Sequence, residues 1–330
     1  MANYLASNFK VYQEYLKTRA AETLQQQAEG FNAAVNNAII MSTIEKPGDY
    51  EYESFFKDIT SLVSRRDTTS VSAATKLSMS QDEFIRVKLN RKIGPVDQTR
   101  DSFRKVFGRY SEMEFSGILG QQIAVAQQLD MLNASLLAAR AALVNVSSGA
   151  MHYTVPSSGT LTTAGLINGL AKMGDRADRI VCWVMHSKPY YDLVQQQMTA
   201  NIDGVSNFNV QTGTPVTLNR PVLVTDSDSL KVTVASPAST TYHTLGLTAS
   251  GVLCEVTETS DIVIDDVTGN ENLLTRMQGE FAYNTGLKGF KWDVSNGGAN
   301  PNDTALGTGS NWDKAASYDK SLAGIVVSSA

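Results

Sequence analysis

The sequence predicts an α+β protein, in which helices and strands come from separate stretches of the chain. Three observations indicate this class: a long helical pattern over residues 111–146, a strand-like alternation over residues 85–93, and short helices and strands between residues 163 and 226. The chain has 330 residues, of which 42% are hydrophobic and 18% are charged. That length and composition predict a folded chain with two domains.

The first element is a helical segment at residues 8–42. These residues are rich in Ala, Gln, Glu and Leu and contain no proline, a composition that favours a helix. The apolar stripe of this helix is thin, which favours an arm that lies against another surface over the centre of a core. The turn at residues 46–50 ends the segment.

The second element is the clearest strand in the chain, because its side chains alternate between apolar and basic. The apolar face carries Ile85, Val87, Leu89 and Ile93, and the basic face carries Arg86, Lys88 and Lys92. Arg91 interrupts the apolar face. We expect residues 70–80 to pair with this strand in a long antiparallel hairpin, and residues 93–96 to form the turn that closes it. Two strands alone are marginally stable, so the hairpin needs a partner surface.

The third element is the long helix at residues 111–146, which contains no proline and repeats apolar residues at steps of three and four. Residues 115–139 carry a single charge, Asp130, so we expect this helix to be covered on several sides. Glutamine and asparagine residues break the apolar stretch, which excludes a transmembrane span.

The remaining elements belong to a second domain that follows a Gly- and Ser-rich linker. Helices and strands alternate in its first part, at residues 163–176, 179–186, 188–199 and 220–226. Strands then dominate up to residue 266. Residues 295–310 are Gly- and Asn-rich, which predicts irregular structure.

Charge is distributed unevenly along the chain. The net charge of −5 excludes a globally basic nucleic-acid binder. Residues 57–109, however, carry 12 basic and six acidic groups, whereas residues 111–330 carry a net charge of −8. Arg86, Lys88 and Lys92 therefore form either a solvated strand face or a contact with the acidic surface of another copy, in a head-to-tail arrangement.

The residue types used in catalysis show no catalytic spacing. His152, His186 and His243 lie in different segments, without a nucleophile motif beside them. Cys182 and Cys254 lie in apolar runs, which is typical of buried thiols in a reducing compartment. We therefore predict no catalytic residue.

Two further patterns could hold a ligand. The acidic run 261–266 could bind a divalent cation, but a solvated acidic edge is the favoured interpretation. The glycines of residues 307–312 lack the Lys-Ser/Thr pair of a phosphate-binding loop. The sequence therefore predicts no cofactor and no metal.

Several segments resemble the major capsid proteins of tailed bacteriophages. They are residues 287–327, 181–194 and 87–108, together with the N-terminal helical arm, and the similarity extends over nearly the whole chain. The resemblance implies the Hong Kong 97-type capsid fold, with an N-terminal arm, an extended β-hairpin called the E-loop, a peripheral domain with a long spine helix, and an axial domain.

The resemblance also implies a division of the chain into these parts. The arm takes residues 1–45, the E-loop hairpin region 46–110, the peripheral domain 111–154 and 266–330 with the spine helix at 111–146, and the axial domain 155–265. The peripheral domain is thus discontinuous in sequence.

The function implied by the resemblance is structural and non-catalytic. The protein would self-assemble, as pentamers and hexamers, into the icosahedral head that encloses the double-stranded DNA of a tailed phage. It would reside in the virion after assembly in the host bacterial cytoplasm, without a membrane. Its partners would be a separate scaffolding protein, a portal, possible decoration proteins, and packaged DNA as a weak, non-specific contact. The alternative is a phage-encoded hydrolase or sugar-binding module built on residues 160–265.

Overall fold

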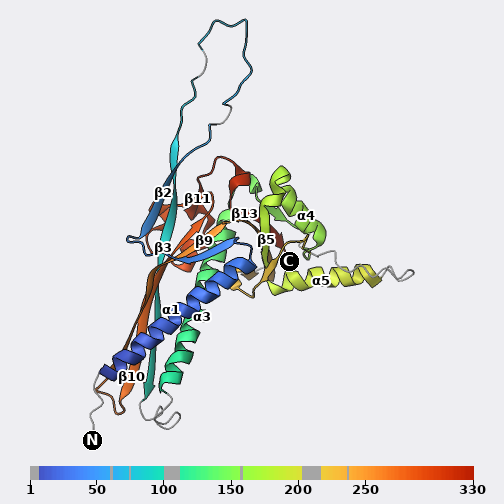
Figure 1. The fold of residues 1–330 in the computed structure, drawn as a ribbon. Helices are drawn as coiled ribbons and strands as arrows, with labels where there is room; N and C mark the ends of the chain where they lie inside the picture. Colours follow the sequence, from blue (N-terminus) through green and yellow to red (C-terminus); the bar gives the residue numbers. More distant parts are fainter. Residues whose placement is uncertain are drawn as a thin grey trace.

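The computed structural model describes residues 7–59, 62–73, 76–99, 112–156, 159–202, 217–235 and 238–330. Helices and strands are mixed, as predicted. A long sheet has two helices running beside it, a second sheet lies next to its middle, and a loop projects from one end (Figure 1). This elongated outline positions the surfaces discussed below.

The long sheet has five strands in the order β1-β9-β10-β3-β2. Their bounds are β1 Ile39–Thr43, β9 Val252–Val267, β10 Leu274–Leu287, β3 Gln81–Thr99 and β2 Tyr50–Phe56. Only the β1–β9 pair is parallel. β3 has 19 residues, which far exceeds the usual strand of about five or six. It stays extended because β10 supplies partners over most of its length.

The predicted hairpin pairing was wrong. β3 pairs with β2, from Tyr50 opposite Val87 to Phe56 opposite Gln81, and the described parts of residues 57–80 contain no strand. The predicted turn at 93–96 lies inside β3, which continues to Thr99. The physical reason is β10, whose register shift between Met277 and Gly279 lies opposite this stretch and lets the ladder continue past it.

Helix α1, Ser7–Ala34, lies in the segment predicted to be a helical arm, and it packs against α3 and β9 of the same subunit. The prediction of helix up to residue 42 was wrong at its end. Asn36 and Asn37 have φ of 51° and 54°, a left-handed conformation that ends the helix. The next residues form β1 because Ile39 and Ile40 are β-branched and find a free edge on β9.

Helix α3, Glu112–Val144, confirms the predicted long helix; residue 111 lies outside the described residues. Its C-terminal half is covered on several sides, with Leu136 and Leu143 fully buried. Residues 119–130 of the helix are less completely covered, since Val125 and Leu129 are 42% and 53% exposed. No helix in the described part of the chain is both long enough and apolar enough to span a bilayer.

The second sheet has the order β4-β13-β8-β5-β6, and β7 also pairs with β8. Its strands are β4 His152–Thr154, β13 Gly324–Ser329, β8 Ala238–Thr248, β5 Ile180–Met185, β6 Val222–Val224 and β7 Lys231–Ala235. Helix α4, Thr163–Ala171, packs on β13, where Gly169 lies against Val327. Helix α5, Ser187–Ile202, starts after β5 and extends away from the sheet (Figure 1).

The segment predicted to be irregular, residues 295–310, folds around two tryptophans. Trp292 of β11 (Phe290–Trp292) and Trp312 of β12 (Trp312–Lys314) meet edge to face at 4.9 Å between ring centroids. Their indole nitrogens donate to the carbonyls of Gly298 and Leu306. The short helices α6 Val294–Gly297 and α7 Asp303–Leu306 lie between these strands in the sequence.

The two sheets do not follow the domain boundaries that were expected from the sequence. Residues 252–265 of β9 lie in the long sheet, although the sequence division places them with residues 155–251. Strands β4 and β13, from the other predicted part, lie in the second sheet. Most buried residues form one core shared by both sheets. A smaller cluster of Leu16, Ile123, Ile262 and Met277 lies apart from it.

Candidate functional site

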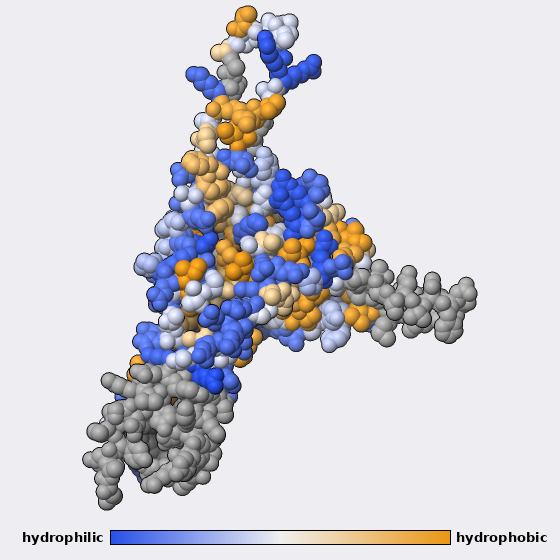
Figure 2. Space-filling model, in the orientation of Figure 1, coloured by the Kyte–Doolittle hydropathy of each residue, from blue (hydrophilic) through white to orange (hydrophobic). Residues whose placement is uncertain are grey.

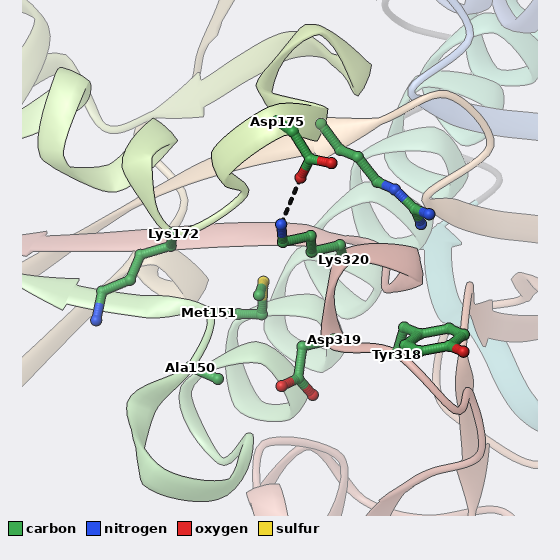
Figure 3. A pocket seen from close by; sticks show the side chains of 8 residues that line it. Ala150, Met151, Lys172, Asp175, Tyr318, Asp319 and Lys320 are labelled. Atoms are coloured by element: carbon green, nitrogen blue, oxygen red, sulfur yellow. Dashed lines mark hydrogen bonds and ion pairs between the residues drawn. The ribbon is translucent and has the colours of Figure 1, made fainter. Parts of the chain in front are cut away.

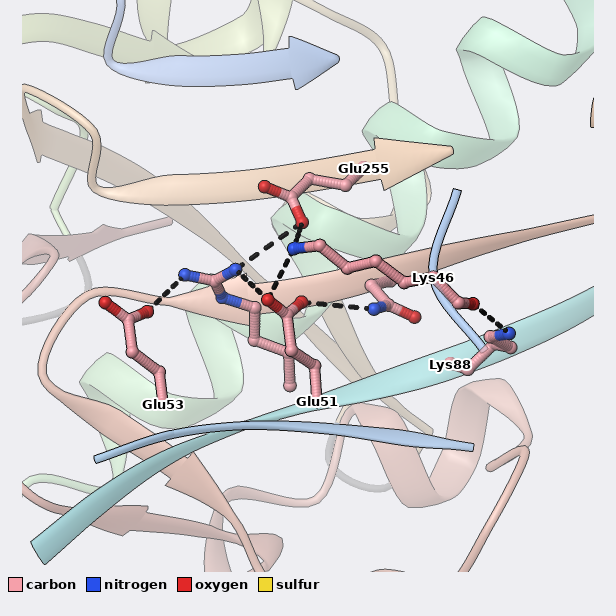
Figure 4. A network of polar contacts seen from close by, with 7 residues as sticks. Lys46, Glu51, Glu53, Lys88 and Glu255 are labelled. Carbon is pink, nitrogen blue, oxygen red and sulfur yellow. Dashed lines mark hydrogen bonds and ion pairs between the residues drawn. The ribbon is translucent and has the colours of Figure 1, made fainter. Parts of the chain in front are cut away.

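The predicted basic face of β3 begins at Arg86, which is bound by carboxylates of its own subunit (Figure 4). Its Nη1 lies 2.9 Å from Oε1 of Glu51, and its Nη2 lies 2.7 Å from Oε2 of Glu53. Both carboxylates belong to β2. Nη1 is also 3.4 Å from Oε2 of Glu255 in β9, two strands away in the other direction. One guanidinium thus links β2, on one side of β3, to β9 on the other side.

Gly286 allows Arg86 to reach that far. This glycine lies in β10, between β3 and β9, and a Cβ atom there would lie 2.6 Å from Cγ of Arg86. The aliphatic part of the Arg86 side chain therefore crosses β10 directly over Gly286. Any larger residue at this position would displace it.

Lys46 completes the network from the segment between β1 and β2. Its ammonium group forms ion pairs with Glu51 and, at 2.8 Å, with Glu255. Burial by itself would raise the pKa of Glu51, but the hydrogen bond from Lys46 and the charge of Arg86 outweigh it and hold that pKa below its ordinary value. Asn284 also donates to Glu51, at 3.2 Å. The network therefore favours the ionised carboxylate.

Lys88, the second predicted residue, is 4% exposed and has its partners within the subunit. Its Nζ donates to the carbonyl of Lys46 at 3.0 Å and to Oε1 of Glu258 at 2.9 Å. Lys92, the third, is exposed, lies opposite Glu280 of β10 in the register, and forms no ion pair within the described residues. The structure thus brings Arg86 and Lys88 into one network and leaves Lys92 on the surface.

The partners of Arg86 and Lys88 explain part of the uneven charge distribution. Glu255 and Glu258 come from the acidic part of the chain, so the complementarity expected between copies is met inside one subunit at these positions.

Sequence reasoning missed a second ion-pair cluster, on the opposite face of β3. Arg91 Nε lies 2.9 Å from Asp130 in α3, and its Nη2 lies 3.0 Å from Asp303. Tyr283 donates to Asp130 at 2.8 Å, and burial, followed by that carboxylate, raises the tyrosine's pKa. The signal was present: Arg91 interrupts an apolar face, and Asp130 is the single charge in a long apolar helix.

The loop between β2 and β3 projects away from the rest of the subunit (Figure 1). Among its described residues, the large apolar side chains are exposed: Leu62 68%, Val63 92%, Val71 104%, Leu77 50% and Met79 65%. Figure 2 shows apolar side chains along this projection and around its base. Sequence reasoning missed this loop because it treated residues 70–80 as a strand. Their four serines and the absence of aromatic residues could have indicated a loop.

The base of the loop is anchored. Phe55 and Phe84 stack with ring centroids 4.2 Å apart. Asp82 forms ion pairs with Lys57 at 2.6 Å and Lys291 at 3.2 Å. The loop therefore leaves the sheet from a fixed position.

The histidines and cysteines occupy structural positions. Ser328 bridges His152 and His243, at 2.7 and 2.9 Å, inside the second sheet. Burial lowers the pKa of His243 to about 4, with the charges of Arg140 and His152 acting in the same direction. Burial raises the pKa of Cys182 to about 11 and of Cys254 to about 12, so both thiols stay protonated. No cluster of metal-ligating side chains occurs among residues that the structure describes.

Two open cavities lie beside the second sheet. The first, about 440 Å³, is lined by Met151, Lys172, Arg176, Tyr318 and other residues, and an ion pair between Lys320 and Asp175 lies at its edge (Figure 3). The second, about 400 Å³, shares Lys320 with it. Neither lining includes a histidine or a cysteine.

Comparison with known proteins decides between the two functional interpretations. The family model of the major capsid protein 13-like proteins matches residues 8–326. The chain belongs to this family. No curated protein matches the chain significantly.

Two solved structures share the fold of this capsid protein. The capsid of Ralstonia phage GP4 matches with a TM-score of 0.50 at 12% identity, over 89% of this chain and 87% of that chain. A chain of Mycobacterium phage Bobi matches with a TM-score of 0.50 at 13% identity, over 89% and 90%.

Family membership confirms the structural interpretation. The protein is a phage major capsid protein, a component of the virion that assembles with copies of itself into a capsid lattice. Nothing in the described residues favours the hydrolase or sugar-binding alternative.

Proposed function

We propose that this major capsid protein has the Hong Kong 97-type fold and forms, as pentamers and hexamers, the icosahedral head that encloses the double-stranded DNA of a tailed phage. The arrangement of elements supports the proposal. α1 corresponds to the arm, the β2–β3 loop to the E-loop, α3 to the spine helix, the long sheet to the peripheral domain and the second sheet to the axial domain.

We propose the domain division given by the sequence, with two changes. That division assigns the arm to residues 1–45, the E-loop region to 46–110, the peripheral domain to 111–154 and 266–330, and the axial domain to 155–265. In our proposal β9 moves to the peripheral domain and β4 and β13 move to the axial domain, because the strands of one sheet are joined by a continuous hydrogen-bond ladder.

The observation that carries the proposal is the projecting β2–β3 loop. Val63 and Val71 are at least nine-tenths exposed on a segment that its own subunit does not cover. Apolar side chains gathered on a projection mark an interaction surface. In a shell, a neighbouring subunit would cover them, and the anchored base of the loop would fix the direction of that contact.

Replacing Val63 and Val71 by Asp tests this role. We expect the V63D/V71D variant to fold with the stability of the wild type and to form no shells by electron microscopy, because two charges would enter an apolar interface. The matched control, S64D/T68D, adds the same charge to polar positions of the same loop and should still assemble. Wild-type assembly by V63D/V71D would refute the role of the loop.

Lys92 is the predicted intersubunit residue that the structure leaves on the surface. We propose that Lys92 contacts an acidic surface of a neighbouring subunit. Arg86 and Lys88 would contribute indirectly, by holding β3, the strand that carries Lys92, in place. If so, K92E should slow assembly and make its rate less sensitive to salt, because salt screens exposed charge pairs. Light scattering across a salt series measures both effects, and an unchanged rate would show that Lys92 is only solvated.

The proposed partners and place of assembly follow from a phage head. They are a separate scaffolding protein, a portal and possible decoration proteins, packaged DNA as a weak, non-specific contact, and assembly in the host cytoplasm, with no catalytic role for the subunit. Expression of the chain with and without a candidate scaffold, followed by electron microscopy, tests the shell. A subunit that stays monomeric in every combination would contradict the proposal.

A further inference from the structure

The second cavity has an unusual lining for a subunit with a negative net charge. It lies where four segments meet: the short helix η3 (Gly174–Arg179), the end of β8, the turn between β10 and β11, and the short helix η6 (Asp319–Ser321). Its lining consists of Arg179, Thr248, Ala249, Lys288, Lys320, Ser321 and Leu322. Three of these residues are cations and none is a carboxylate.

The three cations come from three of these segments. Lys320 forms an ion pair with Asp175, at the edge of the adjoining cavity (Figure 3). Arg179 and Lys288 form no ion pair within the described part of the chain. At least two positive charges of the lining therefore lack a carboxylate partner among the described residues.

Lys288 shows the consequence of this imbalance. Burial, followed by the positive charge of Arg179, lowers its pKa below the ordinary lysine value. Among the residues that the structure describes, its ammonium group has one hydrogen-bond partner, the carbonyl of Ala249 at 3.1 Å. An anion between the two cations would remove their repulsion and supply further acceptors. Arg179 and Lys288 are both exposed, so an anion reaches them directly from solvent, whereas the more deeply buried Arg86 and Lys88 are met by carboxylates of the subunit.

Ser321 adds a neutral donor to the cavity. Its Oγ accepts a hydrogen bond from Arg176 at 3.5 Å, and this contact leaves the hydroxyl hydrogen available to donate. The lining of the cavity thus offers guanidinium, ammonium and hydroxyl donors beside the apolar residues Leu322 and Ala249.

We propose that this cavity binds a phosphate group, held by Arg179, Lys288 and Lys320 with Ser321 as an additional donor. A tetrahedral phosphate accepts hydrogen bonds from several directions, whereas a carboxylate presents two oxygens in one plane, so donors carried by three separate segments fit phosphate better. Its charge also matches two unpaired cations. The source of the phosphate is either the backbone of DNA or a free phosphate compound.

Thermal unfolding of the purified full-length subunit in inorganic phosphate, with ionic strength held constant by sodium chloride, tests the proposal. A ligand that binds the native state raises Tm with concentration. We expect such a rise for the wild type and an affinity about tenfold weaker for R179Q and K288Q, because each loses a charge-assisted hydrogen bond. Arg179 is exposed and its side chain forms no ion pair or hydrogen bond within the described residues, so R179Q separates binding from folding. K188Q, at an exposed lysine of α5, is the matched control.

Competition experiments with DNA and with polyglutamate identify the source of the bound anion. Displacement of phosphate by short double-stranded DNA, lost in R179Q, would identify the backbone as the source; phosphate binding without DNA binding would identify a free phosphate compound. Competition by polyglutamate with no effect of phosphate would assign the cavity to an acidic protein and overturn the proposal. An equal rise of Tm in wild type, R179Q and K188Q would overturn it as well. None of these readouts depends on shell assembly.

Discussion

The base and the loop of the β2–β3 hairpin differ in where their side chains find partners. At the base, Arg86 and Lys88 are enclosed by carboxylates from β2 and β9 of the same subunit. In the loop, Val63 and Val71 have no cover from their own subunit. Polar groups at the base are satisfied before any neighbour arrives, whereas apolar groups of the loop are not. Changes at the base should therefore affect stability, and changes in the loop should affect assembly.

Helix α3 shows the same contrast along its length and gives the largest expected effect. Leu136 is fully buried, whereas Leu129 is 53% exposed. Leu136→Asp should lower the free energy of unfolding by about 5 kcal/mol or abolish folding, because an unpaired carboxylate enters the core. Leu129→Asp should lower it by about 0.5 kcal/mol. Urea unfolding followed by circular dichroism compares the two, and equal losses would contradict the contrast.

Substitution of Arg86 should disrupt the ion-pair network at the base of the hairpin. Arg86→Glu should cost about 4 kcal/mol, because it leaves Lys46 as the one cation shared by Glu51 and Glu255 and adds a fourth carboxylate to the network. Lys92→Glu makes the same charge change six residues along the same strand, at an exposed position, and should cost about 0.5 kcal/mol or less. Chemical unfolding of both variants gives the difference. A similar cost for both would mean that the network at the base contributes little.

The fold was predictable from local pattern where one segment carries its own signal. The α3 helix and the β3 alternation fall in this class, because three- and four-residue steps and strict alternation do not depend on distant partners. The pairing of β2 with β3 was not predictable from pattern, since the loop between them is far longer than an ordinary hairpin turn.

The candidate site shows the same limit. The basic residues of β3 were identifiable by type, but their partners Glu255 and Glu258 lie about 170 residues away and reach them only through the strand order β9-β10-β3. Arg91 and Asp130 were each recognisable as exceptions in an apolar setting, yet only the packing of α3 on the sheet joins them.

Acid should destabilise the interior through the second sheet. Burial, together with Arg140 and His152, lowers the pKa of His243 to about 4, from an ordinary value of 6.5. The native state therefore binds this proton less readily than the unfolded state, and stability is lost as pH falls from 6.5 towards 4, by about 3 kcal/mol in all. Urea unfolding between pH 7 and pH 4 measures the loss. His243→Gln, which keeps a polar group beside Ser328, should flatten that dependence, and an unchanged slope would assign it to other groups.

The smallest effect expected within the base tests how tightly Arg86 is held over β10. Gly286→Ala places a Cβ atom 2.6 Å from Cγ of Arg86, near the rigid end of that side chain, so the guanidinium must move from at least one carboxylate. The expected loss in the free energy of unfolding is about 2 kcal/mol. In an Arg86→Ala background the side chain that collides is absent, so the same substitution should cost much less; the difference between the two costs isolates the crossing from any general effect of alanine in β10. Equal losses of unfolding free energy in both backgrounds would show that Gly286 is needed for another reason. The carboxylates of β2 and β9 would then position Arg86 without help from Gly286.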